Sequence, residues 1–339
     1  MSEIGTGAAI FGCAGPELLA KERGFFRDFD PFGFIIFARN VETPDQLRRL
    51  TGDLRDAVGR EAPILIDQES GRVQRMRAPH WRDWQPPFGT VAQIGDPAKA
   101  ARAMYLRMRI IAAELRDVGI DANCAPVADV ARAATHPFLL NRCYGSDALS
   151  VAQIGRAVAD GLQAGGVWPV VKHMPGHGLS SMDTHLELPT VTASAEELRS
   201  VDFAPFAALK DLPMAMTAHI IFAAFDSLPA TQSPTMIRLI REEIGFSGLL
   251  MTDDLNMEAL KGNLASRTAA SLAAGCDIAL HCKGDFAQME EVAAAAGAMR
   301  ADSQARARAA LASRQAPQPF DLAAAEAELA ALTSEAAHG

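Results

Sequence analysis

The sequence predicts a (β/α)8 barrel of the TIM type, with further helices packed on it at the C-terminal end. Eight short apolar runs recur along the chain, and segments with helical periodicity lie between them. The last run ends at residue 280, close to the length of about 250 residues that such a barrel usually takes. A doubly wound open sheet is the alternative, but no GxGxxG motif follows the first run to favour it.

The apolar runs are expected to be parallel strands buried on both faces, because their apolar character is nearly continuous rather than alternating. They lie at residues 8–12, 33–37, 63–66, 120–124, 167–171, 214–217, 248–251 and 276–280.

Helices are predicted between these runs, at residues 43–59, 96–118, 147–164, 195–209 and 264–274. Thr43 followed by Pro44 is typical of a helix start, and Gly119 and Gly165 are expected to follow helix ends. The alanine-rich tail from about residue 285 is expected to form helices that pack on the barrel and to fray from about residue 333. The whole chain, 1–339, is therefore interpreted as one catalytic domain.

Composition excludes several classes of protein. The 339 residues are 49% hydrophobic, which is ample for a large core, and the net charge of −9 does not suit a nucleic-acid partner. No apolar run is long enough to cross a membrane, and the N-terminus does not resemble a signal peptide. The five cysteines form no CxxC pair, which favours reduced thiols. We expect a cytoplasmic monomer without a nucleic-acid or membrane partner.

Polar residues follow seven of the eight runs. In a barrel these positions converge on the carboxyl-terminal rim, where active sites lie. They are Arg39, Asn40, Asp67, Glu69, Asn123, Lys172, His173, His219, Asp253, Asp254 and His281. The segment VVKHMPGHGLSSMDTHLELP, residues 170–189, also holds three of the eight histidines. The sequence therefore predicts a catalytic rim.

Two chemistries compete for this rim. A metal-dependent barrel hydrolase would use Lys172, His219 and Asp253, but the first run is followed by GCAG, which offers no ligand. His173 and His177 have zinc-like spacing only on a helix, which Pro175 disfavours. Glycoside hydrolysis instead needs a carboxylate and a proton donor, and LLMTDDLNMEAL, residues 249–260, offers two carboxylates at a strand end.

Four segments together resemble the β-N-acetylhexosaminidases of glycoside hydrolase family 3, the cytoplasmic bacterial enzymes of peptidoglycan recycling. They are IDQESGRVQRM (66–76), LLNRCYG (139–145), VKHMPGHGLSSMDTHLELP (171–189) and LLMTDDLNMEAL (249–260), in the family's order. There are departures: Ser70 replaces the first glycine of a pair, so the turn there is expected to differ slightly, and Cys143-Tyr144 replace Ser-Phe.

The resemblance implies a role for each matching residue. Asp253 matches the nucleophile, His185 the general acid/base and Asp183 the partner that tunes it. A histidine suits proton transfer near neutral pH, because its ordinary pKa is about 6.5. The resemblance also implies sugar-binding residues, which are Asp67, Arg75, Arg142, Lys172 and His173.

The implied activity is that of a retaining exo-β-N-acetylglucosaminidase without metal or cofactor. Its substrate would be GlcNAc–1,6-anhydro-N-acetylmuramic acid and its peptide-linked forms. A non-catalytic sugar-binding barrel is the competing class, because a fold alone does not determine function. His177 is interpreted as a structural turn residue, the role of His219 is left open, and the loop 174–186 is expected to be mobile and to close on the sugar.

Overall fold

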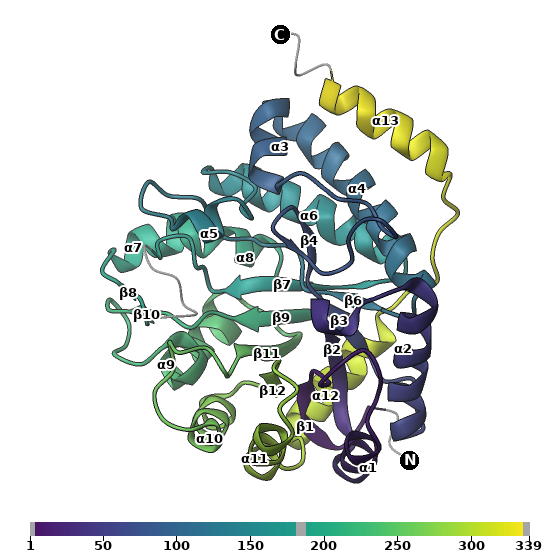
Figure 1. Ribbon diagram of the computed structural model, residues 1–339. Coiled ribbons are helices and arrows are strands. Elements are labelled where there is room, and N and C mark those ends of the chain that lie inside the picture. Colours follow the sequence, from purple (N-terminus) through teal and green to yellow (C-terminus); the bar gives the residue numbers. More distant parts are fainter. Residues whose placement is uncertain (1–3, 181–187, 335–339) are drawn as a thin grey trace.

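The computed structural model describes residues 4–180 and 188–334, and its centre is a closed barrel of eight parallel strands surrounded by helices (Figure 1). The order around the barrel is β1-β2-β3-β6-β7-β9-β11-β12, and β12 pairs with β1 to close it. These strands span Gly7–Phe11, Pro31–Ile36, Ile64–Ile66, Ala122–Asn123, Trp168–Met174, Met214–Thr217, Leu249–Asp254 and Ile278–His281. The predicted barrel and its eight strands are confirmed.

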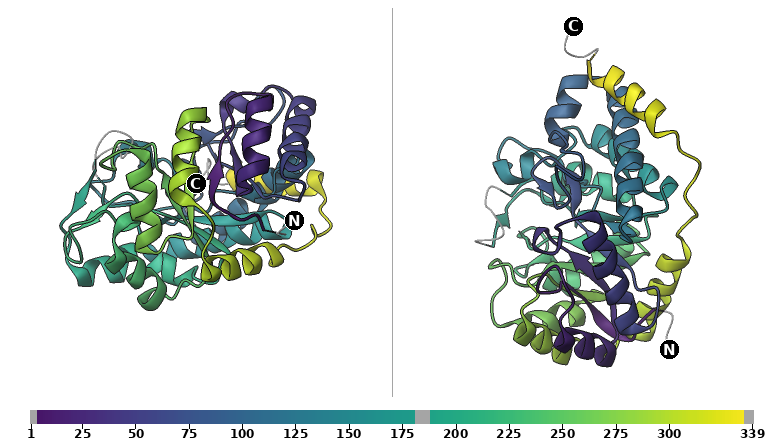
Figure 2. Two further views of the ribbon diagram at one scale, coloured as in Figure 1. Left: turned by 90° about the horizontal axis from the view of Figure 1, so that it is seen from below. Right: turned by 45° about the vertical axis from the view of Figure 1, so that its right-hand side comes forward.

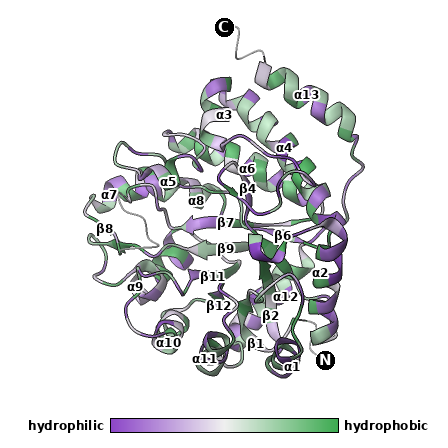
Figure 3. Ribbon diagram, in the orientation of Figure 1, coloured by the Kyte–Doolittle hydropathy of each residue, from purple (hydrophilic) through white to green (hydrophobic). Residues whose placement is uncertain are grey.

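Helices form the outer ring. They are α1 (Ala20–Phe29), α2 (Pro44–Val58), α3 (Pro87–Ile94), α4 (Pro97–Asp117), α5 (Pro137–Leu140), α6 (Ala148–Ala164), α7 (Ala195–Glu197), α8 (Ala204–Ala208), α9 (Pro234–Arg238), α10 (Leu264–Ala274) and α11 (Phe286–Ala296). The outward face of α2 is hydrophilic, whereas its leucines are buried (Figure 3). Thr43 caps α2 as predicted, accepting a hydrogen bond from the Gln46 N–H at 3.2 Å.

One local prediction needs correction. The helix predicted at 195–209 is divided, because a π-helical segment (Leu198–Asp202) separates α7 from α8. Pro205 has no N–H to donate to the preceding turn, so one continuous helix cannot run through it. Gly165 directly follows the end of α6, as predicted, and the next residue, Gly166, takes the left-handed conformation with φ of +74°.

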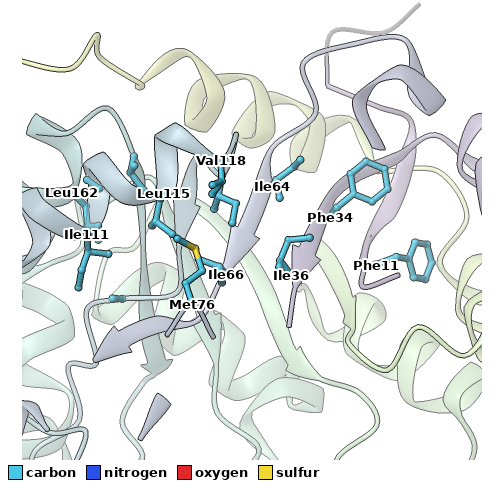
Figure 4. Packing of buried hydrophobic residues seen from close by; sticks show 14 of the residues in the cluster. Phe11, Phe34, Ile36, Ile64, Ile66, Met76, Ile111, Leu115, Val118 and Leu162 are labelled. Atoms are coloured by element: carbon cyan, nitrogen blue, oxygen red, sulfur yellow. The ribbon is translucent and has the colours of Figure 1, made fainter. Parts of the chain in front are cut away.

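The core has two layers, because successive side chains of a strand point to opposite faces. Ile10, Ile35 and Leu65 fill the barrel interior together with other buried side chains. Phe34 and Ile64 belong instead to the outer cluster of buried side chains, which also holds residues of α1, α2, α4 and α6 (Figure 4). The centroid of the Phe34 ring lies 4.9 Å from that of Phe26 in α1. These side chains are at most 1% exposed, so burial on both faces explains the continuous apolar runs of the sequence.

The C-terminal tail forms the predicted helices. Ala307 and Ala310 of α12 (Ala301–Ala312) join the interior cluster of the barrel, and α13 (Leu322–Ser334) lies beside α3 and α4 (Figure 2). Residues 335–339, the end of the tail that is expected to fray, lie outside the described residues. Within the described part of the chain, no helix is long and apolar enough to span a membrane.

Two small sheets lie outside the barrel and were not predicted. β4 (Gln68–Ser70) and β5 (Val73–Gln74) form an antiparallel hairpin directly after β3. β8 (Thr190–Val191) pairs in parallel with β10 (Ile221–Phe222). The hairpin matters for function, because it follows the carboxyl end of a barrel strand.

Candidate active site

A cavity of about 280 Å³ opens where the carboxyl ends of the barrel strands meet. Six of the eight residues predicted for the site line this cavity, and they come from four separate parts of the chain. They are Asp67, Arg75, Arg142, Lys172, His173 and Asp253. Asp183 and His185 lie outside the described residues.

Five charged side chains form one ion-pair network at the cavity wall. Lys172 Nζ lies 2.7 Å from Asp67 Oδ1 and 2.6 Å from Glu69 Oε1. Arg75 donates to Asp67 Oδ2 at 2.7 Å, and Arg142 donates to both oxygens of Glu69 at 2.8 Å. Three cations face two carboxylates, so the network carries a net charge of +1.

The network keeps its members ionised. Burial acts to raise the pKa of Asp67, but Lys172 and Arg75 lower it below its usual range. Burial acts to lower the pKa of Lys172, but Asp67 and Glu69 raise it. Each charged form is stabilised by opposite charges in contact with it. The cavity therefore presents fixed cationic donors and a fixed carboxylate acceptor, which suit the hydroxyl groups of a sugar.

A second network positions the hairpin that carries Asp67 and Arg75. The Asn123 side chain accepts from the Gln68 N–H and donates to the Gln68 carbonyl, both at 3.0 Å. The Gln68 side chain in turn accepts from the Arg75 N–H at 2.9 Å. Asn123, predicted at the rim, therefore holds the backbone of the site.

Ser70, which departs from the family pattern, has φ of +100°. Glycine favours this region, and another residue there costs about 1–3 kcal/mol. The hairpin therefore takes a conformation suited to glycine, and the serine carries the strain. The next residue, Gly71, could not bear a Cβ, because that atom would lie 2.7 Å from Pro86 Cα.

His173 is held by a buried carboxylate. Its Nδ1 lies 2.8 Å from Asp129 Oδ2, and its Nε2 lies 3.3 Å from Arg142 Nη2. Because a carboxylate only accepts, Nδ1 of His173 carries a proton and donates it to Asp129. The Lys172–His173 peptide bond is cis, and both side chains line the cavity.

Asp253 stands at the end of β11 and faces the cavity. Its Oδ1 accepts the Asp254 N–H at 2.8 Å, and no cation of the described residues lies within 4 Å of it. Burial acts to raise the pKa of Asp253, but His173, His219 and the Asp254 N–H lower it. Asp253 is therefore an ionised carboxylate with an oxygen still free to react.

Asp254, the second carboxylate of the pair, is used differently. Its Oδ1 accepts the Asn256 N–H at 3.1 Å and the Cys282 N–H at 3.2 Å, so it organises the turn after the strand. Burial raises its pKa to about 6. The open question about His219 is also answered, since its ring bonds Thr231 Oγ1 at 2.8 Å and the Asp254 carbonyl at 3.1 Å. It supports this turn and does not line the cavity.

His177 does more than hold a turn. Its backbone N–H donates to Asp129 at 2.7 Å, as a structural residue would, but its buried ring also lines the cavity. Burial and the neighbouring His173 lower its pKa to about 3, so the ring is neutral. Its Nδ1 has no hydrogen-bond partner among the residues that the structure describes.

The segment 174–180, the beginning of the loop expected to move, is tightly packed. A Cβ on Gly178 would lie 1.9 Å from the Val130 carbonyl oxygen, and one on Gly176 would lie 2.8 Å from that of Asp202. These glycines allow close contact between backbones, rather than the mobility expected from the sequence. Residues 181–187 lie outside the described part, so closure of the loop stays a prediction.

Some residues were missed or undervalued by sequence reasoning. Glu69 was placed at the rim without a role, although it lies two positions after Asp67 in the same motif. Arg72, His136 and Phe138 were given no role, yet all three line the cavity. Only the motif position of Glu69 offered a signal; the others reach the cavity through the folding of two loops.

Residues 29–311 match the family described as "Glycosyl hydrolase family 3 N terminal domain". The chain belongs to glycoside hydrolase family 3. It is 37% identical over 285 residues to a beta-hexosaminidase of Alkalilimnicola ehrlichii, covering 81% of this chain and 80% of the relative. It is 35% identical over 283 residues to a beta-hexosaminidase of Bordetella avium, with 81% and 80% covered.

Crystal structures of family 3 NagZ are also similar. Native NagZ from Neisseria gonorrhoeae has a TM-score of 0.83 and 30% identity, with 98% of this chain and 99% of that chain covered. NagZ from the same organism in complex with zinc ion has a TM-score of 0.85 and 28% identity, with 98% and 100% covered. Together these relatives show that the protein is a glycoside hydrolase with β-N-acetylhexosaminidase activity.

Of the three residues considered for a metal-dependent hydrolase, Lys172 and Asp253 line the cavity and His219 does not. Lys172 is committed to two carboxylates, and His219 faces Thr231 rather than the cavity. Over residues 4–180 and 188–334, no three His, Cys, Asp or Glu side chains are grouped so as to hold a metal ion.

Proposed function

We propose that this family 3 enzyme is a retaining exo-β-N-acetylglucosaminidase. Its proposed substrates are GlcNAc–1,6-anhydro-N-acetylmuramic acid and the peptide-linked forms, from which it releases terminal GlcNAc. The observation that carries the proposal is the ionised Asp253 carboxylate, which faces a cavity lined by fixed sugar-binding charges. The resemblance to peptidoglycan-recycling enzymes supports the choice of substrate.

In the proposed reaction, Asp253 attacks the anomeric carbon and forms a covalent glycosyl-enzyme. His185 protonates the departing oxygen, and Asp183 orients the imidazole and stabilises its charged form. His185 then takes a proton from water, which attacks the anomeric carbon and releases Asp253. Two inversions give net retention. Asp183 and His185 take these roles from the family motif, because both lie outside the described residues.

The cavity supports removal of one sugar at a time. Its volume of about 280 Å³ is near the lower end of ligand sites, which span roughly 300–1,000 Å³. Lys172, Arg142 and Asp67 would hold the ring hydroxyls, together with Arg75 and His173. This arrangement suits one ring, with the leaving group outside it.

Hydrolysis of 4-nitrophenyl β-N-acetylglucosaminide, followed by NMR, tests the reaction. The β-anomer of GlcNAc should appear first, and a 2-fluoro glycoside should label Asp253. Initial appearance of the α-anomer, or labelling of another residue, would refute double displacement by Asp253. EDTA should leave the rate unchanged, whereas a metal-dependent hydrolase would lose activity.

The role of His185 is tested by the leaving group. His185→Ala should slow the natural disaccharide more than the 4-nitrophenyl glycoside, because nitrophenolate departs with little protonation. Equal losses on both substrates would count against His185 as the acid.

The family resemblance also supports action in the cytoplasm, and we propose that the chain is a monomer. Cell fractionation and light scattering of the purified chain test these two points.

A further inference from the structure

The mouth of the cavity carries an arginine that the proposed mechanism does not use. Arg72 lines the cavity, yet its side chain is exposed, whereas Lys172, Arg142 and His173 are buried deeper in the wall. Phe138 and His136, which are half-buried, line the cavity beside it. These three residues come from two loops, one after β3 and the other before and within α5.

The position of Arg72 is well defined. Its guanidinium carbon lies 4.5 Å from the centroid of the Phe138 ring, an arrangement typical of a cation–π contact. Arg77 donates to the carbonyls of Gly71 and Arg72, at 2.8 and 3.0 Å. Stacking occupies one face of the guanidinium and leaves its N–H edges available.

The charge of Arg72 is not neutralised. The other cations of the cavity, Arg75, Arg142 and Lys172, each contact Asp67 or Glu69. No carboxylate of residues 4–180 or 188–334 lies within 4 Å of the Arg72 guanidinium. An exposed, oriented and unpaired guanidinium is a binding group for a carboxylate.

We propose that Arg72 selects substrates whose leaving group carries a carboxylate. The inference rests on the proposed function, in which the GlcNAc ring fills the cavity and the leaving group lies at its mouth. The apolar face of the leaving group would contact Phe138, and its carboxylate would accept hydrogen bonds from Arg72. His136 offers a second donor, because its Nδ1 accepts the Phe138 N–H and the neutral ring then carries its proton on Nε2.

Two chromogenic substrates test the proposal. The first is 4-nitrophenyl β-N-acetylglucosaminide, and the second is its 3-carboxy-4-nitrophenyl analogue. Arg72→Gln should lower kcat/KM for the carboxylated substrate about tenfold, as expected for one charge-assisted hydrogen bond, and change the uncharged one less than about twofold. Arg72→Lys should recover part of the loss, and 0.5 M NaCl should reduce the wild-type advantage of the carboxylated substrate.

Arg49→Gln is the matched control, because it removes the same charge from an exposed position on α2 outside the cavity. It should leave the ratio of the two substrates unchanged. Equal effects of Arg72→Gln on both substrates, or no effect on either, would overturn the proposal. If the wild-type enzyme hydrolysed neither of the two substrates, the proposed function itself would be contradicted.

The carboxylate has two sources in the proposed substrates, the lactyl group of the muramic acid and the attached peptide. The disaccharide with a free lactyl acid, its methyl ester and a peptide-linked form distinguish them. A loss caused by Arg72→Gln on the free acid but not on the ester assigns the lactyl carboxylate. A loss confined to the peptide-linked form assigns a peptide carboxylate, and equal losses on all three contradict carboxylate recognition.

Discussion

The two ends of the barrel use the same charged residues in different ways. At the amino end, Asp277 directly precedes β12 and is fully buried, and its carboxylate contacts Arg241 and Arg306 at 2.8 and 2.7 Å. Ser303 Oγ and the Leu250 N–H also donate to it, at 2.7 and 2.9 Å. Both of its oxygens have partners, and no reactive group is left.

Asp121, which precedes β6, repeats this pattern. Its carboxylate contacts Arg55 at 3.1 Å and Arg314 at 2.7 Å, and accepts the Ile64 N–H at 2.7 Å. Arg314, like Arg306 of the other cluster, belongs to the C-terminal segment. The aspartates before the strands therefore attach the tail to the barrel.

Asp67 and Asp253, which follow strands, face a cavity instead. The network that contains Asp67 has a surplus positive charge, and Asp253 has no cation of the described residues within 4 Å. The comparison shows that position relative to the strand, rather than residue type, separates stabilising charges from reactive ones. This is expected in a barrel, whose amino end serves stability and whose carboxyl end serves function.

The largest expected effect is on Asp253. Asp253→Asn should lower kcat about 10⁴-fold or more, because the nucleophile is lost, and change stability by less than about 1 kcal/mol. Asp254→Asn is the matched comparison, since it alters the neighbouring carboxylate, whose Oδ1 accepts two backbone N–H groups of the turn. Rates on 4-nitrophenyl β-N-acetylglucosaminide and urea unfolding measure both variants. Comparable losses in the two would break the proposed division of roles.

The second-largest effect on activity is expected when a cationic side chain of the ion-pair network is truncated. Lys172→Ala should lower kcat/KM by about 10²–10³-fold, with part of the loss in kcat if the contact strengthens in the transition state. The substitution also removes a cationic partner from the buried Asp67 and Glu69, so it can destabilise the fold. Circular dichroism should therefore confirm that the variant is folded under the conditions of the assay. Lys210→Ala, an exposed position outside the cavity, is the control. Near-wild-type values for Lys172→Ala would show that Lys172 does not bind the sugar.

The amino end should respond in stability rather than in rate. Asp277→Asn should lower the free energy of unfolding by about 3 kcal/mol, because two arginines lose a buried partner, while kcat at 25 °C stays near wild type. Asp302→Asn removes a more exposed carboxylate from the same Arg306 and should cost less than about 1 kcal/mol. A large loss of kcat in folded Asp277→Asn would contradict the comparison.

The smallest effect concerns His177 and the dependence of stability on pH. Its pKa of about 3 lies below the unfolded value, so between about pH 3 and 6.5 the unfolded chain binds a proton that the folded protein does not. Stability should therefore fall as the pH falls through this range. His177→Gln should reduce the slope near pH 5 by about 1 kcal/mol per pH unit, measured by urea unfolding at several pH values. An unchanged slope would mean that His177 is not buried as a neutral ring.

Sequence patterns predicted much of this molecule because burial leaves a direct trace in them. The eight strands were located because parallel strands covered on both faces are almost continuously apolar. The cavity residues at strand ends, such as Asp67 and Asp253, were found because the barrel brings those ends together. The division of the helix at 195–209 was missed, although Pro205 offered a local signal. The buried Asp202 in the π-helical segment also pairs with Arg132 at 2.7 Å, a partner distant in sequence.

The sequence by itself therefore determined the order of the elements, the fold class and which strand ends carry reactive groups. Tertiary structure decided how the charges are paired: Glu69 with Lys172 and Arg142, and Asp129 with His173. It also decided that Arg72 lines the cavity without an ion-pair partner among residues 4–180 and 188–334. Hydrophobic periodicity is a property of neighbouring residues, whereas pairing depends on distances between groups far apart in the chain, which exist only once the barrel has closed.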